Sequence, residues 1–293
     1  EALRMQTGVS RKVSPDVGLL ISNGTWLGGL LSRLRQPASI QEREVPASVR
    51  ATLRAYQHTG YNWLNYMNEL GFGACLADDM GLGKTVQILA YLQRMAQDHA
   101  DARVLLVVPA SLIGNWQKEI GKFTPKLPYF ILHGGGKTMG QEFLAHPAFL
   151  TITTYGMAGR MNETLSARHW NALILDEAQA IKNPAAQQTK AAKKIPADIR
   201  IAMTGTPIEN NLSNLWSLFD FLDKGLLGTS TEFKNFTKQL KDHPEGYQKL
   251  RNLVSPFILR RLKTDKTIIA DLPEKLEQDD YISLSARQVV LYR

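Results

Sequence analysis

A glycine-containing loop between an apolar run and a helical pattern limits what this chain can fold into more than any other feature. Ala74-Cys-Leu-Ala77 predicts a buried strand, and Val86-Gln-Ile-Leu-Ala-Tyr-Leu92 carries apolar side chains at helical spacing. The loop between them reads Asp78-Asp-Met-Gly-Leu-Gly-Lys-Thr85. A strand, a glycine loop and a helix in this order are the context of a phosphate-binding loop, although Asp78 replaces the first glycine of that motif. An ordinary strand–turn–helix with a surface lysine is the alternative interpretation.

The residue types in the loop suit a polyphosphate. Gly81 and Gly83 allow a tight turn and a close approach of the backbone to an anion. The amides that begin the next helix point at the anion, and the helix dipole adds to the attraction. Lys84 can then reach the terminal phosphates, and the hydroxyl of Thr85 can bind Mg²⁺.

Two adjacent carboxylates end a second apolar strand. In Asn171-Ala-Leu-Ile-Leu-Asp-Glu-Ala-Gln179 the strand runs into Asp176 and Glu177. Open α/β sheets bind ligands at this carboxyl edge of their strands. One carboxylate there can hold Mg²⁺, and the other can polarise an attacking water as a general base. Solvated carboxylates are the alternative, which the upstream loop disfavours.

Composition adds weaker constraints. The net charge of +8 and the sequence pI of about 9.5 favour a polyanionic partner, but only weakly. The single cysteine, Cys75, excludes an internal disulfide framework and is expected to be a small buried hydrophobe. No apolar run approaches the roughly 18 residues of a membrane-spanning helix, and the N-terminus lacks a signal-peptide pattern. We therefore expect no membrane partner and a cytosolic fragment of a longer protein.

Alternating buried strands and helices predict an α/β fold with a mostly parallel sheet. The expected strands are Ala74–Ala77, Arg103–Pro109, Leu127–Leu132, Phe149–Thr154, the apolar part of Asn171–Gln179 and the start of Arg200–Pro207. The expected helices are Trp26–Leu34, Val49–Leu70 with an end at Gly71–Gly73, the segment from Val86, Ser111–Ile120 with Ser111 as its cap, and Leu212–Leu222. His133–Lys137 is expected to be a turn.

Some side chains are assigned to the surface by the same pattern. Arg54 and Gln57 lie off the apolar stripe of the Val49–Leu70 helix, so a solvent-facing helix surface is the alternative to a functional role for them. Residues Asp223–Leu253 lack strand signals and are expected to be helical. The basic cluster that follows (Arg260, Arg261 and Lys263) is as consistent with a solvated face as with a functional patch.

The ordered motifs resemble the first motor lobe of the Snf2 family of ATPases, in helicase superfamily 2, across residues 49–293. The matching stretches are Leu53–Gln57 with Trp63-Leu64 for the adenine-recognising motif, Ala77–Thr85 for motif I, Val108–Trp116 for motif Ia, Ile152–Tyr155 for motif Ib, Asp176–Pro184 for motif II, Met203–Trp216 for motif III and its tail, and Pro256–Asp265 with Leu272–Lys275 for the brace and interlobe segment. The family tolerates a residue other than glycine at position 78. The box Asp-Glu-Ala-Gln and the flanking residues 1–45 look more like bacterial members than chromatin remodellers.

The resemblance implies an architecture and an activity. It implies a RecA-like P-loop NTPase lobe at residues 46–222, a flanking segment at 1–45, a helical family-specific insertion at 223–262 and an interlobe connector at 263–293. The implied activity is a DNA-dependent ATPase that uses ATP and Mg²⁺ to translocate on double-stranded DNA. The implied location is the bacterial cytoplasm, in association with the nucleoid, or the nucleus if the source is eukaryotic.

The resemblance also implies roles for individual residues. The catalytic set is Lys84, Asp176, Glu177 and Gln179, and the nucleotide-binding set is Gln57, Asp79, Met80, Gly81, Leu82, Gly83, Lys84 and Thr85. Thr85 and Asp176 would hold the metal. Ser111, Asn115, Lys118, Thr153 and Thr154 would contact DNA phosphates, so binding should be independent of sequence and sensitive to salt. Thr204, Gly205 and Thr206 would couple the ATP site to DNA.

Catalysis in such a motor needs a second RecA-like lobe, which brings an arginine finger. A lobe of that kind needs roughly 150 residues, which do not fit after Lys275. Residues 1–293 alone are therefore expected to bind ATP weakly and to hydrolyse it scarcely at all.

Two other functions stay open at this point. The first is an RNA-directed or strand-separating helicase of superfamily 2, which the motif III tail Pro207–Trp216 and Arg260-Arg261 argue against. The second is a nucleotide-dependent binding module without hydrolysis, which the intact Lys84, Thr85, Asp176 and Glu177 argue against. The process served, the direction of movement, the partner proteins and the oligomeric state do not follow from the sequence.

Overall fold

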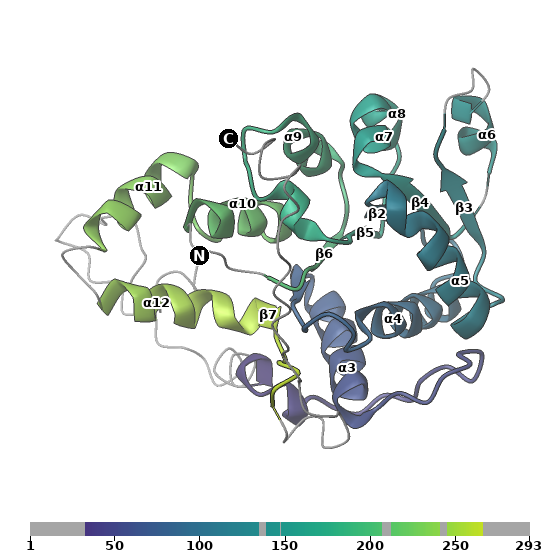
Figure 1. Cartoon of the computed structure of the whole chain (residues 1–293), viewed down its shortest axis with the longest axis horizontal. Coiled ribbons are helices and arrows are strands. Elements are labelled where there is room, and N and C mark those ends of the chain that lie inside the picture. Colours follow the sequence, from purple (N-terminus) through teal and green to yellow (C-terminus); the bar gives the residue numbers. More distant parts are fainter. Residues whose placement is uncertain (1–32, 135–138, 147, 207–211, 241–244, 266–293) are drawn as a thin grey trace, which may run out of the picture. The chain divides into compact units, whose positions relative to one another are not determined.

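The sheet that carries the loop and the acidic pair is parallel throughout its described part. The computed structural model describes residues 33–134, 139–146, 148–206, 212–240 and 245–265. Seven strands lie in the order β3-β4-β2-β5-β6-β1-β7 (Figure 1). They are β1 (Ala74–Leu76), β2 (Val104–Val108), β3 (Tyr129–Leu132), β4 (Leu150–Thr154), β5 (Ala172–Leu175), β6 (Ile199–Met203) and β7 (Ile258–Leu259). All described strand pairs are parallel, so the predicted α/β class is confirmed.

Helices cover both faces of the sheet because its strands are apolar on both sides. In β2, Val104, Leu106 and Val108 join one core cluster, while Leu105 and Val107 join another. The first cluster includes side chains of α3 (Ala55–Leu70), α4 (Lys84–Asp98) and α5 (Ile113–Phe123). The second includes side chains of α6 (Met139–Ala145), α7 (Tyr155–Arg160), α8 (Asn162–Ser166) and α9 (Gln187–Lys194). Figure 1 shows α3 to α5 on one side of the strands and α7 to α9 on the other.

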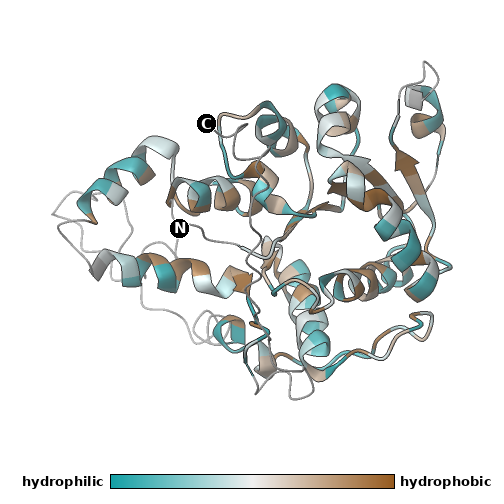
Figure 2. Cartoon of the chain, in the orientation of Figure 1, coloured by the Kyte–Doolittle hydropathy of each residue, from teal (hydrophilic) through white to brown (hydrophobic). Residues whose placement is uncertain are grey.

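The hydropathy pattern follows this layering. Figure 2 shows hydrophobic residues along the strands and a mixture of hydrophobic and hydrophilic residues on the helices. In α5, for example, Ile113, Trp116 and Ile120 are buried at helical spacing, and the other positions are partly or fully exposed. Burial of such apolar surface stabilises the packing of the helices against the sheet by about 25 cal/mol per Å².

The chain returns to the sheet after a helical excursion. Helix α10 (Leu212–Leu222) is followed by α11 (Ser230–Gln239) and α12 (Glu245–Val254), in agreement with the helical prediction for this stretch. Strand β7 then pairs with β1 in parallel, through Cys75 with Ile258 and Leu76 with Leu259. Because β1 leads into the glycine loop, residues near position 260 come to lie beside that loop.

The chain divides into two compact units after Leu262. The first holds the sheet and its helices, and the second, residues 263–293, falls almost entirely outside the described residues. Most of the Trp26–Leu34 helix, the Leu272–Lys275 segment and most of the His133–Lys137 turn also fall outside them. Within the described part, no helix combines the length and hydropathy needed to span a bilayer.

Two local predictions were wrong, and four helices were missed. The helix expected from Val49 begins at Ala55, because Arg54 adopts an extended backbone and acts as its cap. Ser111 does not cap the next helix: it lies in a short 3-10 turn, and Leu112 stands at the cap position. The four helices α6 to α9 were not expected from the sequence.

Candidate nucleotide-binding site

The glycine loop has the backbone geometry that its sequence predicts. It leaves β1 and ends where α4 begins at Lys84. Gly81 and Gly83 have φ angles of 83° and 76°, in the left-handed region that glycine adopts without strain. A Cβ on Gly83 would lie 2.4 Å from Nε2 of Gln57, so a larger residue would displace that side chain. The first amides of α4 follow Gly83 directly, and such a helix N-terminus can bind phosphate.

Lys84 lies within the electrostatic field of the two carboxylates. Its Nζ donates hydrogen bonds to the backbone oxygens of Asp78, at 2.6 Å, and Asp79, at 3.4 Å. Burial lowers the pKa of the Lys84 ammonium, while the negative charges of Asp78, Glu177 and Asp176 oppose that shift. The loop lysine and the acidic pair of β5 thus belong to one site.

Asp176 is oriented on both of its carboxylate oxygens. Its Oδ2 accepts a 2.8 Å hydrogen bond from Nε1 of Trp116, and its Oδ1 accepts one of 2.9 Å from the amide of Glu177. Its backbone oxygen accepts from the hydroxyl of Tyr155 at 2.7 Å. Burial raises the pKa of Asp176, the bond from Trp116 opposes this, and the charge of Glu177 adds to it. The carboxylate is therefore held in one rotamer and keeps free lone pairs.

Glu177 has an unusual backbone. Its φ of 49° makes it the only residue other than glycine with positive φ among those that the structure describes. Such a conformation costs about 1–3 kcal/mol and persists where the surroundings demand it. Nε2 of Gln179 donates to the Glu177 carboxylate at 2.6 Å, so the strained residue also has a fixed side chain.

A hydrogen-bond chain links this pair to the end of β6. Oγ1 of Thr204 donates to Oε1 of Gln179 at 3.1 Å and accepts from the amide of Thr206 at 3.2 Å. Nζ of Lys182 donates to Oγ1 of Thr206 at 3.3 Å. Gly205 lies between the two threonines, and a Cβ added to it would lie 3.6 Å from Cγ of Met80 in the glycine loop. Of the proposed coupling residues, Thr204 therefore contacts the proposed catalytic residue Gln179 directly, and Thr206 contacts it through Thr204.

Gln57 contacts the loop, so the solvent-facing alternative does not describe its side chain. Its Nε2 donates to the backbone oxygen of Leu82 at 3.1 Å, and its Oε1 accepts from the amide of Arg54 at 3.0 Å. The hydroxyl of Tyr56 donates to the same Leu82 oxygen at 3.1 Å. Gln57 lies off the apolar stripe of α3, but the glycine loop, rather than water, contacts this side of the helix.

Asp78, the residue in place of the motif's first glycine, is completely buried and paired with Arg261. Nε of Arg261 donates to Oδ1 of Asp78 at 2.7 Å, and a second guanidinium nitrogen donates to Oδ2. Gln87 bonds to both partners: its Nε2 donates to Asp78 and its Oε1 accepts from Arg261. The amide of Asp79 also donates to the backbone oxygen of Arg261 at 3.0 Å. The loop is therefore tied to the segment after β7.

The solvated-face interpretation of the basic cluster was thus wrong for Arg261, which is 6% exposed, and fits Arg260 and Lys263, which are exposed. The presence of Asp78 at the first glycine position was the sequence signal for the buried role of Arg261, because a carboxylate buried beside a phosphate loop needs a cationic partner.

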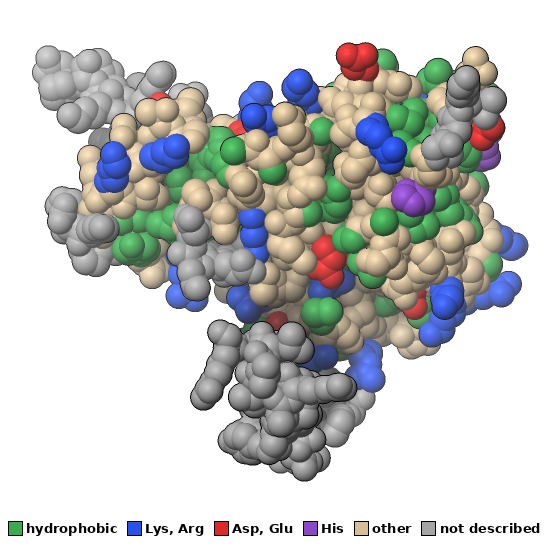
Figure 3. Space-filling model, turned by 45° about the horizontal axis from the view of Figure 1, so that its top comes forward, with side chains coloured by type: hydrophobic (Ala, Val, Ile, Leu, Met, Phe, Trp, Pro, Cys, Tyr) green, Lys and Arg blue, Asp and Glu red, His purple; other side chains and the backbone are tan. Residues whose placement is uncertain are grey.

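The residues proposed for DNA contact fall into two groups. Ser111, Asn115 and Lys118 are exposed on the turn before α5 and on α5 itself. Thr153 and Thr154 are buried: the hydroxyl of Thr153 donates to Leu132 at 2.8 Å, and that of Thr154 caps α7. As placed here, these two side chains are not available to a phosphate. Figure 3 shows lysine and arginine side chains dispersed over the face that it draws.

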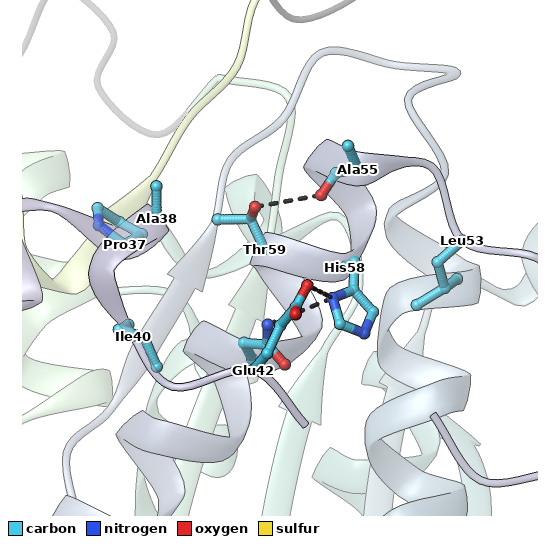
Figure 4. Close-up of a pocket in the computed structure, with 9 residues that line it drawn as sticks. Pro37, Ala38, Ile40, Glu42, Leu53, Ala55, His58 and Thr59 are labelled. Carbon is cyan, nitrogen blue, oxygen red and sulfur yellow. Dashed lines mark hydrogen bonds and ion pairs between the residues drawn. The ribbon is translucent and has the colours of Figure 1, made fainter. Parts of the chain in front are cut away.

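A cavity on the other side of α3 does not belong to this site. It measures about 650 Å³ and is lined by residues that include Pro37, Ile40, Glu42, Leu53 and His58. Two of these side chains, Glu42 and His58, face each other (Figure 4), and Oε1 of Glu42 lies 3.4 Å from Nδ1 of His58. None of its lining residues comes from the glycine loop or the acidic pair.

Mg²⁺ suits the residues at the centre of the site. Among the described residues, no group of three or more His, Cys, Asp and Glu side chains could form an all-protein metal cage. Mg²⁺ is usually held by one or two carboxylates together with substrate phosphates and water. Thr85, in the first turn of α4, and the oriented carboxylate of Asp176 match that donor set.

Comparison with known proteins decides the family. Residues 56–293 match the SNF2-related domain. The chain belongs to this family. The predicted resemblance to a Snf2-type ATPase lobe is therefore confirmed.

Relatives come from bacteria, archaea and eukaryotes. YwqA of Bacillus subtilis, named as an ATP-dependent helicase/translocase, is 43% identical over 95% of this chain and 31% of its own length. TATA-binding protein-associated factor MOT1 of Saccharomyces cerevisiae is 35% identical over 89% of this chain and 15% of its own. The Sulfolobus solfataricus SWI2/SNF2 ATPase core, solved in complex with double-stranded DNA, aligns with a TM-score of 0.73 and 40% identity over 86% of this chain and 53% of that one.

This SNF2-family chain thus spans at most a third of these curated relatives and about half of the solved ATPase core. Four residues make hydrogen bonds that fix the site, and the sequence did not predict this role for any of them: Trp116 and Tyr155 bond to Asp176, and Gln87 and Arg261 bond to Asp78.

Proposed function

We propose that this SNF2-family lobe binds ATP with Mg²⁺ and supplies the hydrolytic residues of a DNA-dependent ATPase that translocates on double-stranded DNA. The observation that supports the proposal is that Lys84, which follows β1, and Asp176 and Glu177, which follow β5, lie at the same carboxyl edge of one parallel sheet, where both carboxylates oppose the lowering of the Lys84 pKa. The ionised groups of these three residues lie at the carboxyl edge of the sheet, where a triphosphate would bind. The double-stranded DNA in the related Sulfolobus structure supports the choice of polymer.

Each residue has a role that its geometry permits. The amides after Gly83 and the ammonium of Lys84 bind phosphate oxygens in place of the carbonyls that Lys84 now contacts. Asp176, fixed by its hydrogen bonds, and Thr85 hold Mg²⁺, which when bound neutralises charge on the phosphates. Glu177 accepts a proton from the attacking water, and Gln179 keeps its carboxylate in place.

We further infer that residues 1–293 alone turn ATP over slowly. The solved ATPase core is about twice as long as the part that this chain covers. An arginine finger from a second lobe contributes about 10³ to 10⁵ in turnover in phosphoryl-transfer enzymes. A DNA-stimulated rate typical of a complete motor, measured on residues 1–293, would contradict this inference.

Steady-state ATPase assays of the full-length protein test the proposal. Glu177→Gln is expected to lower DNA-stimulated hydrolysis by about 10² to 10⁴ while it leaves nucleotide binding intact. Lys84→Ala is expected to weaken nucleotide binding as well, and Lys190→Ala, which removes an exposed lysine of α9, serves as its control. Hydrolysis that survives both Glu177→Gln and Lys84→Ala would refute the site.

The choice of nucleic acid is tested in the same assay. Double-stranded DNA is expected to stimulate hydrolysis more than single-stranded DNA or RNA. A preference for RNA would favour the RNA-directed helicase, and nucleotide binding without phosphate release would favour the non-hydrolysing module.

A further inference from the structure

We propose that Trp116 is the positioning residue through which helix α5 controls the metal-binding carboxylate of Asp176. The inference rests on the proposed function, because it takes Asp176 as a ligand of Mg²⁺ and the exposed side of α5 as a DNA-facing surface. It assigns to Trp116 a role beyond packing: its indole N–H sets how well the site holds the metal, and α5 transmits the presence of DNA to that bond.

The contact between them spans the site. Trp116 lies in the first half of α5, and Asp176 is the first residue after β5, 60 positions along the chain. Nε1 of Trp116 donates to Oδ2 of Asp176 at 2.8 Å, and Trp116 is 1% exposed. A buried hydrogen bond from a neutral donor to a carboxylate fixes the orientation of that carboxylate. The other carboxylate oxygen, Oδ1, accepts from the backbone amide of Glu177, so Trp116 supplies a side-chain donor to this carboxylate.

Groups that orient a metal ligand matter to metal affinity. Replacing hydrogen-bond partners of ligating residues typically costs 10- to 100-fold in metal affinity or activity. In this site the partner is an aromatic side chain buried in the core cluster of α3, α4 and α5, so it cannot shift without a movement of its own helix.

The opposite side of the same helix faces outward. Asn115 and Lys118, one residue before and two after Trp116, are exposed. A polyanion bound to Asn115 and Lys118 would contact the same helix that carries the indole of Trp116. Because the indole belongs to α5, a small shift of the helix moves Nε1 relative to Asp176. Trp116 therefore connects α5 to the proposed metal site through one side chain and one hydrogen bond.

The chain offers a matched control in Trp170. Like Trp116, it is 1% exposed, and its Nε1 donates at 2.8 Å, but to the backbone oxygen of Leu165. Trp116→Phe and Trp170→Phe therefore remove the same ring volume and the same kind of donor. Only the first change removes a hydrogen bond to the acidic pair.

The test measures metal dependence apart from turnover. The full-length protein is titrated with Mg²⁺ while the binding of a fluorescent, non-hydrolysable ATP analogue is followed, and binding is also measured in EDTA. Trp116→Phe is expected to raise the Mg²⁺ concentration at half-maximal binding by about 10- to 100-fold and to leave the affinity in EDTA unchanged. Trp170→Phe is expected to match the wild type in both. Equal shifts in the two variants would overturn the proposal.

A second variant guards against a folding defect. A benzothiophene analogue of tryptophan at position 116 keeps the bicyclic shape and lacks only the N–H donor. It is expected to reproduce the raised Mg²⁺ requirement with an unfolding midpoint like that of the wild type. A wild-type Mg²⁺ requirement in this variant would overturn the proposal.

The link to DNA is tested by repeating the titration with saturating duplex DNA. DNA is expected to lower the Mg²⁺ midpoint of the wild type by about fivefold or more, a typical coupling between two sites, and to have little effect on Trp116→Phe. Equal DNA effects in both proteins would overturn the transmission through Trp116. A wild type without DNA-stimulated hydrolysis would overturn the proposed function, whereas a stimulated wild type with an unaffected Trp116→Phe would overturn this inference alone.

Discussion

The buried pair of Asp78 and Arg261 gives the sharpest prediction about stability. Arg261→Met removes the guanidinium and keeps most of the apolar stem. The change leaves the carboxylate of Asp78, which is 0% exposed, with Gln87 as its remaining side-chain donor. It also leaves the backbone oxygen of Tyr56 without the donor that Arg261 provides.

The expected cost follows from this geometry. Removing one partner of a buried ion pair typically costs about 3–5 kcal/mol, because the other charge stays buried without compensation. Removing both charges at once often has little net effect, so Asp78→Leu combined with Arg261→Met is expected to recover most of the loss. An exposed pair provides the comparison: Arg94 and Asp98 lie one helical turn apart in α4, at 2.7 Å, with side chains 33% and 41% exposed. Arg94→Met is expected to cost only about 0.3–0.5 kcal/mol.

Amide hydrogen exchange in increasing urea measures these costs within a longer protein. Peptides that cover β1 and β6 report the unfolding free energy of this unit, whatever the rest of the full-length chain does. The expected order of destabilisation is Arg261→Met well above the double variant, and the double variant near Arg94→Met. If Arg261→Met cost no more than Arg94→Met, the pair would not hold the loop to the segment after β7.

Three further predictions concern single positions. Alanine at position 83 would have to adopt the left-handed backbone of Gly83, which costs about 1–3 kcal/mol. Gly83→Ala should therefore weaken binding of an ATP analogue by about tenfold or more in a titration. Gly114→Ala, whose new Cβ meets no neighbouring atom, should not weaken it. Burial raises the pKa of Asp223 to about 6, so the folded state retains a proton that the unfolded state has lost, and the resulting stability should disappear as the pH rises through about 6. Asp223→Asn should flatten this decline in urea-unfolding midpoints measured between about pH 4 and pH 7. An unchanged decline in the variant would exclude Asp223 as its source. Lys118→Ala should reduce the slope of log affinity against log salt by about one for every duplex sequence tested, and a sequence-dependent loss would contradict a phosphate contact.

Local patterns carried most of the fold and the centre of the site. The phosphate loop and the acid pair were predictable because each occupies a few consecutive residues whose chemistry depends on a strand end and a glycine turn. The helices α6 to α9 were not, because they are five to eight residues long and too short to show a periodic apolar stripe.

Contacts between distant parts of the chain could not be predicted in the same way. Asp78 and Arg261 are 183 positions apart, and Trp116 and Asp176 are 60 positions apart. Periodicity marked Trp116 as a buried residue, but it could not say that its N–H would meet a carboxylate at the end of another strand. The contact of Gln57 with Leu82 could not be read from the helical pattern for the same reason, since Leu82 belongs to a loop 25 residues later.

The most direct test of the account is a crystal structure of the full-length protein with Mg²⁺ and a non-hydrolysable ATP analogue. The account predicts terminal phosphates in contact with Lys84 and the first amides of α4. It also predicts the metal in direct or water-bridged contact with Thr85 and Asp176. Phosphates bound elsewhere, or a metal that contacts neither Thr85 nor Asp176, would contradict it.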